Sequence, residues 1–119
     1  MTSHSETRSL PYTARQMYDL VAEVSKYPDF LPWCAAARVR KTTELGDHSV
    51  MEADLVISFK VFRERFGSRV KMWPEKMSID TEYLDGPFRF LKSTWSFVDT
   101  DNGCDVSFFV DFEFRNALL

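Results

Sequence analysis

The spacing of apolar residues changes once along the chain, and the change separates a short helical part from a long β part. Residues 3–10 alternate irregularly and end before a proline, which favours a first strand. Thr13-Ala14-Arg15-Gln16 then matches a capping box, in which Thr13 caps a helix and Gln16 reaches back to it. The apolar residues that follow have the spacing of one face of an amphipathic helix: Met17, Leu20, Val21 and Val24.

Beyond this helix, the segment Tyr27-Pro28-Asp29-Phe30-Leu31-Pro32-Trp33-Cys34 joins the two parts of the chain. Its two prolines allow at most one helical turn between them. Three aromatic rings and a leucine in so short a stretch must either pack into a core or hold a ligand. The pattern alone leaves both interpretations open.

From residue 35 onward the apolar period is two, which is the period of strands with one buried face. The alternating runs are 37–45, 51–59, 64–72, 77–83, 88–98 and 104–114. Turn sequences separate them, the clearest being Asp85-Gly86-Pro87 and Asp101-Asn102-Gly103. Consecutive hairpins without crossover helices predict an antiparallel sheet of about six to seven strands, and hence an α+β fold.

The apolar sides of these strands form a wide surface, for which the sequence supplies only one helix and one helical turn as cover. An apolar sheet face needs a second layer. Residues 116–119 look like the first turn of a helix that would supply this layer. Two interpretations remain: a packed aromatic core, or a cavity for a hydrophobic small molecule.

Composition and charge narrow the class of protein. The 119 residues are enough for a single domain, 1–119, and the apolar fraction of 45% is typical of a globular chain. A net charge of −3 disfavours a protein whose main partner is DNA or RNA. No apolar run approaches the roughly 20 residues that span a bilayer. The N-terminus has no apolar signal-peptide core, so we expect a cytoplasmic protein of bacterial type.

Catalytic and metal-binding residues are not indicated. Cys34 could form a nucleophilic pair only with His4 or His48, and a buried hydrophobic role for the cysteine is favoured. No His, Cys and carboxylate set has the spacing of metal ligands, so we expect no metal. Arg65, Arg69 and Lys71 share one strand face, which we interpret as a solvated face; a patch for anionic lipid or RNA is the alternative.

Several motifs resemble a known family. The segment 27–34 closely resembles the signature of the coenzyme Q-binding START-domain proteins, within the polyketide cyclase/dehydrase and lipid-transport superfamily. The resemblance continues through Phe66-Gly67-Ser68-Arg69-Val70 and Gly86-Pro87-Phe88-Arg89-Phe90-Leu91. It ends with Val106-Ser107-Phe108 and Asp111-Phe112-Glu113-Phe114. Related bacterial proteins are described as ribosome association toxins.

The resemblance implies a helix-grip fold, in which a curved antiparallel sheet wraps a long C-terminal helix. It implies that ubiquinone or a similar polyprenyl lipid binds between them. Such a protein would act as a lipid chaperone for respiration and ubiquinone biosynthesis, with no catalysed reaction and no cofactor. It would contact the inner membrane peripherally. The alternative that the resemblance raises is a toxin that blocks the association of ribosomal subunits.

The resemblance also assigns an apolar lining to the cavity. The candidate ligand-binding residues are Tyr27, Phe30, Leu31, Trp33, Leu55, Ile57, Phe59, Phe66, Val70, Phe88, Trp95, Phe97, Phe108 and Phe112. The family's C-terminal helix would begin where this sequence ends. One wall is therefore expected to be missing, and an exposed apolar face of that size predicts self-association.

Overall fold

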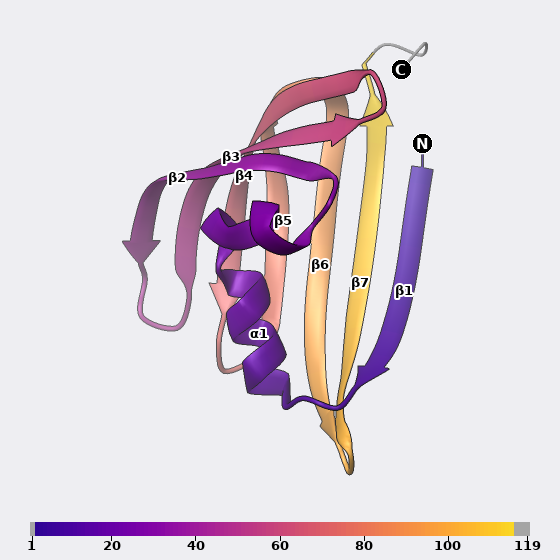
Figure 1. The fold of residues 1–119 in the computed structure, drawn as a ribbon. Helices are drawn as coiled ribbons and strands as arrows, with labels where there is room; N and C mark the ends of the chain where they lie inside the picture. The colour runs from indigo at the N-terminus through magenta and orange to yellow at the C-terminus, as the bar shows by residue number, and fades with distance from the viewer. Residues whose placement is uncertain (1, 116–119) are drawn as a thin grey trace.

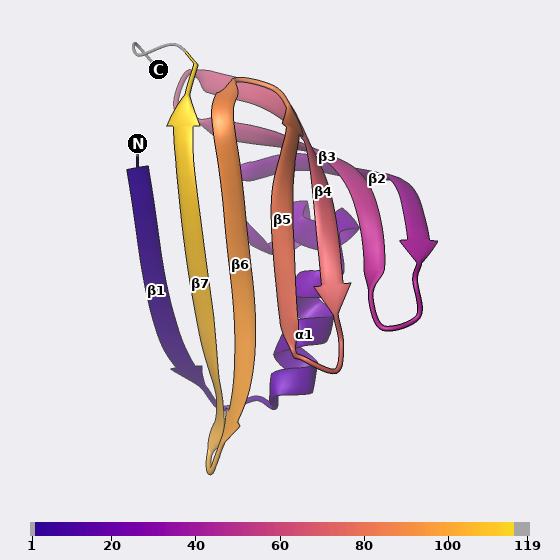
Figure 2. The ribbon, with the colours of Figure 1, turned by 180° about the vertical axis from the view of Figure 1, so that it is seen from behind.

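In the part of the chain that the structure describes, a curved antiparallel sheet holds the helical segments on one of its faces (Figures 1 and 2). The structure is a computed structural model that describes residues 2–115. The strands are β1 (Thr2–Leu10), β2 (Cys34–Glu44), β3 (Ser49–Phe59), β4 (Phe62–Trp73), β5 (Ser78–Asp85), β6 (Phe88–Thr100) and β7 (Gly103–Phe114). The helical segments are α1 (Ala14–Ala22), a 3₁₀ turn (Val24–Lys26) and α2 (Tyr27–Phe30). The residues interpreted as the start of a further helix, 116–119, lie outside the described range.

The seven strands follow the order β1-β7-β6-β5-β4-β3-β2, and every neighbouring pair is antiparallel. From β2 to β7 each strand pairs with the next one in sequence, so this part is a run of hairpins. β1 instead crosses to the far edge and pairs with β7 (Figure 2). The α+β prediction with about six to seven antiparallel strands is confirmed.

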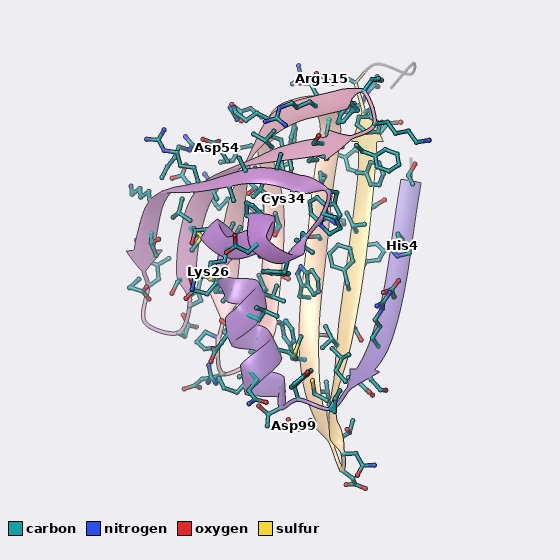
Figure 3. The ribbon with its side chains drawn as sticks, viewed as in Figure 1. His4, Lys26, Cys34, Asp54, Asp99 and Arg115 are labelled. Atoms are coloured by element: carbon teal, nitrogen blue, oxygen red, sulfur yellow. The ribbon has the colours of Figure 1, made fainter. Side chains whose placement is uncertain are left out.

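The predicted capping box opens α1. Thr13 accepts a hydrogen bond from the Gln16 backbone N–H at 3.1 Å, and the Gln16 side chain accepts one from the Thr13 N–H at 2.9 Å. Asp99, at the end of β6, accepts a third bond from the Ala14 N–H at 2.8 Å and so ties the helix to the sheet (Figure 3). The backbone N–H groups at the start of α1 therefore have hydrogen-bond partners both within the helix and on the sheet.

The predicted apolar face of α1 is confirmed at Met17 and Val21 and is wrong at one position. Ala14, Tyr18 and Val21 are buried, whereas Leu20, which the sequence places inward, is 43% exposed. The Tyr18 ring meets Phe97 of the sheet edge-on, with the ring centroids 5.8 Å apart. This contact rolls the helix so that its tyrosine, rather than its leucine, faces the core. The spacing rule identified the amphipathic helix and most of its buried side, but not the burial of Tyr18 in place of Leu20.

Candidate functional site

A cavity of about 560 Å³ lies between the concave face of the sheet and the helical segment 24–33. This volume is within the range of about 300–1,000 Å³ that is typical of small-molecule sites. The cavity brings together most of the residues that the family resemblance assigns to a lining. Those that line it are Tyr27, Leu31, Trp33, Leu55, Ile57, Phe59, Phe66, Val70, Phe88, Trp95, Phe108 and Phe112.

Two of the assigned residues lie elsewhere. Phe97 is 3% exposed and packs against Tyr18 in the core below α1, so it does not face the cavity. Phe30 is 39% exposed, and its ring stands edge-on to Tyr27 at 5.7 Å on the outer side of the turn. Each ring has an aromatic contact outside the sheet lining, Phe97 with Tyr18 of α1 and Phe30 with Tyr27 within α2. Strand alternation and the motif do not encode such contacts.

Eight further residues complete the lining: Val24, Phe62, Ser68, Thr81, Leu91, Ser93, Val110 and Phe114. Most share the inward face of a predicted strand, so the period of two was the signal that could have found them. Phe62 was missed because it falls between the predicted strand runs 51–59 and 64–72. The structure instead begins β4 at this residue, directly opposite Phe59.

The segment 27–33 forms one wall of the cavity, and hydrogen bonds hold it in place. The Tyr27 hydroxyl donates to the Val21 carbonyl at 2.7 Å, and the Leu31 N–H closes the single turn onto the Tyr27 carbonyl at 2.8 Å. The Trp33 carbonyl accepts from the Ser58 N–H at 2.9 Å, which fastens the end of the segment to β3. Burial raises the pKa of Tyr27, so its phenol stays protonated at neutral pH.

An aromatic cluster forms the wall at the end of the cavity away from α1. Phe88 lies at its centre, with its ring edge-on to Phe66 at 5.7 Å and to Phe112 at 5.8 Å. It stacks on Phe114 at 4.9 Å, and Phe62 meets Phe114 edge-on at 5.7 Å. Each offset or edge-on pair adds roughly 0.5–1.5 kcal/mol beyond area burial. The cluster therefore keeps a defined shape before any ligand enters.

The nucleophilic pair considered for Cys34 is not formed. Cys34 is buried, its sulfur lies 3.4 Å from the Ala36 carbonyl oxygen, and burial raises the pKa of its thiol. His4 lies on the edge strand β1, away from Cys34 (Figure 3). His48 stacks on Trp73 at a centroid distance of 4.0 Å. Cys34 therefore has neither a base beside it nor a thiol poised to ionise.

The basic residues of the outer face alternate with carboxylates. Arg65 lies 3.1 Å from Asp54 and 3.2 Å from Asp85, while Arg69 and Lys71 flank Glu82 at 3.6 and 2.8 Å. Opposite charges at this spacing cancel much of the field that would attract a polyanion. The geometry favours the interpretation of this face as a solvated one.

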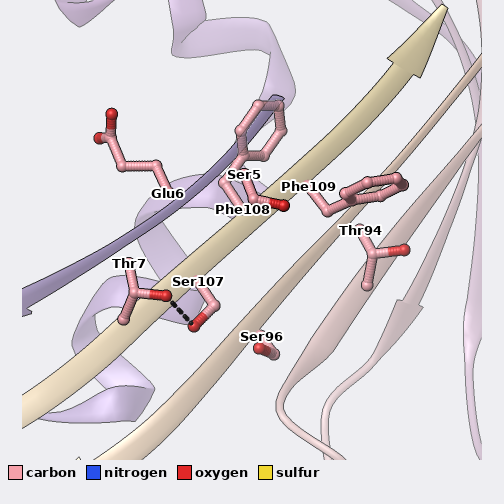
Figure 4. Close-up of a pocket in the computed structure, with 8 residues that line it drawn as sticks. All are labelled: Ser5, Glu6, Thr7, Thr94, Ser96, Ser107, Phe108 and Phe109. Carbon is pink, nitrogen blue, oxygen red and sulfur yellow. Dashed lines mark hydrogen bonds between the residues drawn. The ribbon is translucent and has the colours of Figure 1, made fainter. Parts of the chain in front are cut away.

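A second, smaller hollow of about 170 Å³ lies on the outer side of β1, β7 and β6 (Figure 4). Its side chains are mostly short and polar, and the Thr7 and Ser107 hydroxyls hydrogen-bond across it at 3.0 Å. It is too small and too polar for a lipid chain. No helix among the described residues is long and apolar enough to cross a membrane.

An open antiparallel sheet that grips short helices around an apolar cavity is the architecture of a START-like lipid-binding domain. The chain belongs to the family described as polyketide cyclase/dehydrase and lipid transport, whose pattern it matches over residues 10–119. The family predicted from the sequence motifs is thereby confirmed.

Similar proteins carry different names. Ribosome association toxin RatA from Rickettsia prowazekii is 38% identical over 122 residues, which cover 100% of this chain and 81% of that protein. Coenzyme Q-binding protein COQ10 homolog B, mitochondrial, from Xenopus laevis is 32% identical over 120 residues, covering 97% of this chain and 47% of that protein.

Solved structures agree with the fold. The solution structure of an 18 kDa protein from Caulobacter crescentus superposes with a TM-score of 0.85 at 36% identity, covering 99% of this chain and 80% of that one. A START superfamily protein from Mycobacterium smegmatis gives a TM-score of 0.83 at 17% identity, covering 97% of this chain and 79% of that one. The START-like expectation for the fold is confirmed.

Proposed function

We propose that the cavity binds ubiquinone or a similar polyprenyl lipid, and that the protein acts as a carrier of this lipid without catalysing a reaction. The observation that carries the proposal is the lining itself. It is built from aromatic and branched aliphatic side chains, with hydroxyls and the indole N–H groups of Trp33 and Trp95 as its polar groups. Burying each CH₂ of an apolar tail contributes about 0.8 kcal/mol, so a polyprenyl chain needs few hydrogen bonds to bind.

The same lining favours a carrier over an enzyme of the cyclase type. Proton transfer requires an acid or a base within hydrogen-bond reach of the substrate. None of the residues that form the described wall is an Asp, Glu, His, Lys or Arg. Tyr27 is the ionisable oxygen of the wall, and its hydroxyl is already donated to the Val21 carbonyl. A carrier working beside a membrane needs only to shield the tail from water.

Lipid mass spectrometry on the protein extracted from cells, followed by titration with a short-chain ubiquinone, tests the proposal. We expect a quinone to co-purify and to bind on titration. Trp33→Ala should weaken binding about tenfold, or ~1.4 kcal/mol, because an apolar contact with the ligand is lost. Trp33 is 42% exposed, so its removal should change the melting temperature little.

The matched control is Phe109→Ala, which removes an aromatic ring from the outer face at a similar exposure of 37%. It should leave quinone affinity unchanged. Trp95→Ala is a second lining variant, but Trp95 also stacks on Phe97 at 6.3 Å, so its melting must be measured beside its binding. The absence of any quinone, both after purification and on titration, would overturn the proposal.

A second candidate function is association with the ribosome, which the name of the 38% identical relative favours. Cosedimentation with ribosomal subunits tests it, and association through the outer basic residues should weaken steeply as salt rises. A variant carrying both Arg65→Gln and Arg69→Gln should lose binding. If the doubly substituted protein still cosediments, this face is not the contact surface.

A further inference from the structure

One cross-strand row in the cavity is chemically different from the others. Residues 70, 81, 93 and 110 stand directly opposite one another on β4, β5, β6 and β7. All four line the cavity. The outer two are Val70 and Val110, but the central two are Thr81 and Ser93. Side chains directly opposite on neighbouring strands have Cβ atoms about 4.5–5.5 Å apart, so the two hydroxyls form a pair.

The hydroxyls of this pair have no hydrogen-bond partner within residues 2–115, unlike the other hydroxyls of the cavity. Ser68 donates to the Ala53 carbonyl at 3.3 Å, and Tyr27 donates to the Val21 carbonyl. Ser93 is 9% exposed, and no buried side-chain oxygen of the described residues lacks a hydrogen-bond partner, so the Ser93 hydroxyl is open to the cavity. A ligand that fills the cavity takes both hydroxyls out of water, which costs free energy unless an oxygen atom of the ligand bonds to them.

The pair lies near the end of the cavity that the core beneath α1 closes. Val70 belongs to the core beneath α1, and Trp95 packs against that core. Behind the hydroxyls, the rings of Trp95 and Phe108 lie 4.5 Å apart and provide an apolar surface for a flat ring. The opposite end is formed by Phe62 and the 63% exposed Phe59. Phe62 and Val70 are about 26 Å apart along β4 at 3.3 Å per residue, which is room for a tail.

From this arrangement we infer that Thr81 and Ser93 bind an oxygen atom on the ring of the ligand, so that the head group lies at the closed end and the tail extends toward Phe59 and Phe62. The inference rests on the proposed lipid-binding function and adds to it the orientation of the ligand and the residues that select its head. A hydroxyl pair can donate to a carbonyl oxygen or accept from a hydroxyl. The ligand class is therefore a prenylated ring that carries oxygen.

The test compares two ligands on three forms of the full-length protein by calorimetric titration. The ligands are ubiquinone with a two-isoprene tail and a hydrocarbon of similar length that has no oxygen. The forms are the unaltered protein, the doubly substituted Thr81→Val/Ser93→Ala, and the control Thr94→Val/Ser96→Ala. The control removes the same two hydroxyl types from the outer face of β6, where Thr94 and Ser96 line the smaller hollow (Figure 4).

We expect Thr81→Val/Ser93→Ala to bind the quinone about tenfold more weakly, equal to ~1.4 kcal/mol, and the hydrocarbon as well as before. The control should bind both ligands normally. A loss shared equally by both ligands, or no loss at all, overturns the inference while leaving lipid binding intact. If the unaltered protein binds neither ligand, the proposed function itself fails. Should the double variant not fold, Ser93→Ala alone is held to the same comparison.

Discussion

Cys34 lies where the segment 27–33 passes into β2, and its environment makes it a packing residue. Burial raises the pKa of its thiol, and it does the same for Cys104, which has 0% exposure. A thiol reacts as its thiolate, so both cysteines should be slow nucleophiles near neutral pH.

We predict that neither cysteine is alkylated by iodoacetamide at pH 8 in the folded protein, and that both are alkylated in urea. Intact-protein mass spectrometry counts the added groups directly. Rapid labelling of Cys34 in the folded state would contradict this, and would reopen the question of thiol chemistry at this position. Cys104 serves as the internal reference, because it is buried in the core next to α1.

Single residues also mark where inference from the sequence stops. Phe97 and Phe108 both fall on the inward side of their strands, yet one packs against Tyr18 and the other lines the cavity. An apolar period of two predicts which face of the sheet a side chain occupies. It does not predict which part of that face a helix covers. That position depends on contacts between residues far apart in sequence, such as Tyr18 with Phe97. The structure places Phe30 and Phe97 away from the cavity wall and the other assigned residues on it, and their role in ligand binding stays a prediction.

At the scale of elements, the junction between β1 and β7 limits which side chains the sheet accepts. Gly103 begins β7 where Leu10 ends β1, and a Cβ at this glycine would lie 1.9 Å from the Leu10 carbonyl oxygen. Such an approach is far inside van der Waals contact, and the neighbour is backbone rather than a flexible side chain. The two strands have to separate to accommodate it.

We predict that Gly103→Ala lowers the free energy of unfolding by about 1–3 kcal/mol, the usual cost of overpacking. Urea denaturation measures the change. Gly46→Ala is the control, since Gly46 has a φ of +90° but no atom within 4 Å of an added Cβ. The stability lost in the Gly46→Ala variant should reflect backbone strain alone, and it should be smaller than the stability lost in the Gly103→Ala variant. Equal losses would contradict a steric cause at Gly103.

The elements themselves follow closely from the sequence. The capping box, the single turn between the prolines and the hairpin turns all appear where local chemistry places them. Strand ends are less exact, because β2 begins at Cys34, three residues before the predicted run at 37. Pairing with β3 extends β2 past its alternating part, with register shifts between Cys34 and Ala36 and between Val39 and Lys41. Long-range hydrogen bonds, rather than side-chain pattern, fix that boundary.

At the scale of the whole molecule, the sheet separates an apolar concave face from an outer face of paired charges. Glu82 on β5 is central to the outer face, with Lys71 Nζ 2.8 Å from its carboxylate and Arg69 at 3.6 Å. The hydrogen bond from Lys71 holds the pKa of Glu82 below its usual range. The folded-state pKa is thus lower than the unfolded one. The stability that this carboxylate contributes is present above the unfolded pKa and is lost as pH falls through the folded value.

We predict that the melting temperature of the unaltered protein falls between pH 6 and pH 3. The melting temperature of the Glu82→Gln variant should fall by less over the same range. The difference should be small, because the Glu82 side chain is 47% exposed and solvent screens the pair. Glu75→Gln, on the exposed turn after β4, is the control and should follow the unaltered protein. Identical pH profiles for all three proteins would show that the outer pairs do not contribute to acid stability.

The cross-strand row of Val70, Thr81, Ser93 and Val110 has a consequence for how such a domain can be redesigned. The four side chains of the row face the cavity. The residues before and after each of them on its strand point to the outer face of the sheet. Exchanging hydroxyl and aliphatic side chains along this row changes what the cavity prefers without disturbing the ion pairs on the other side. A library confined to positions 81 and 93 is therefore a compact starting point for engineering carriers of other prenylated rings.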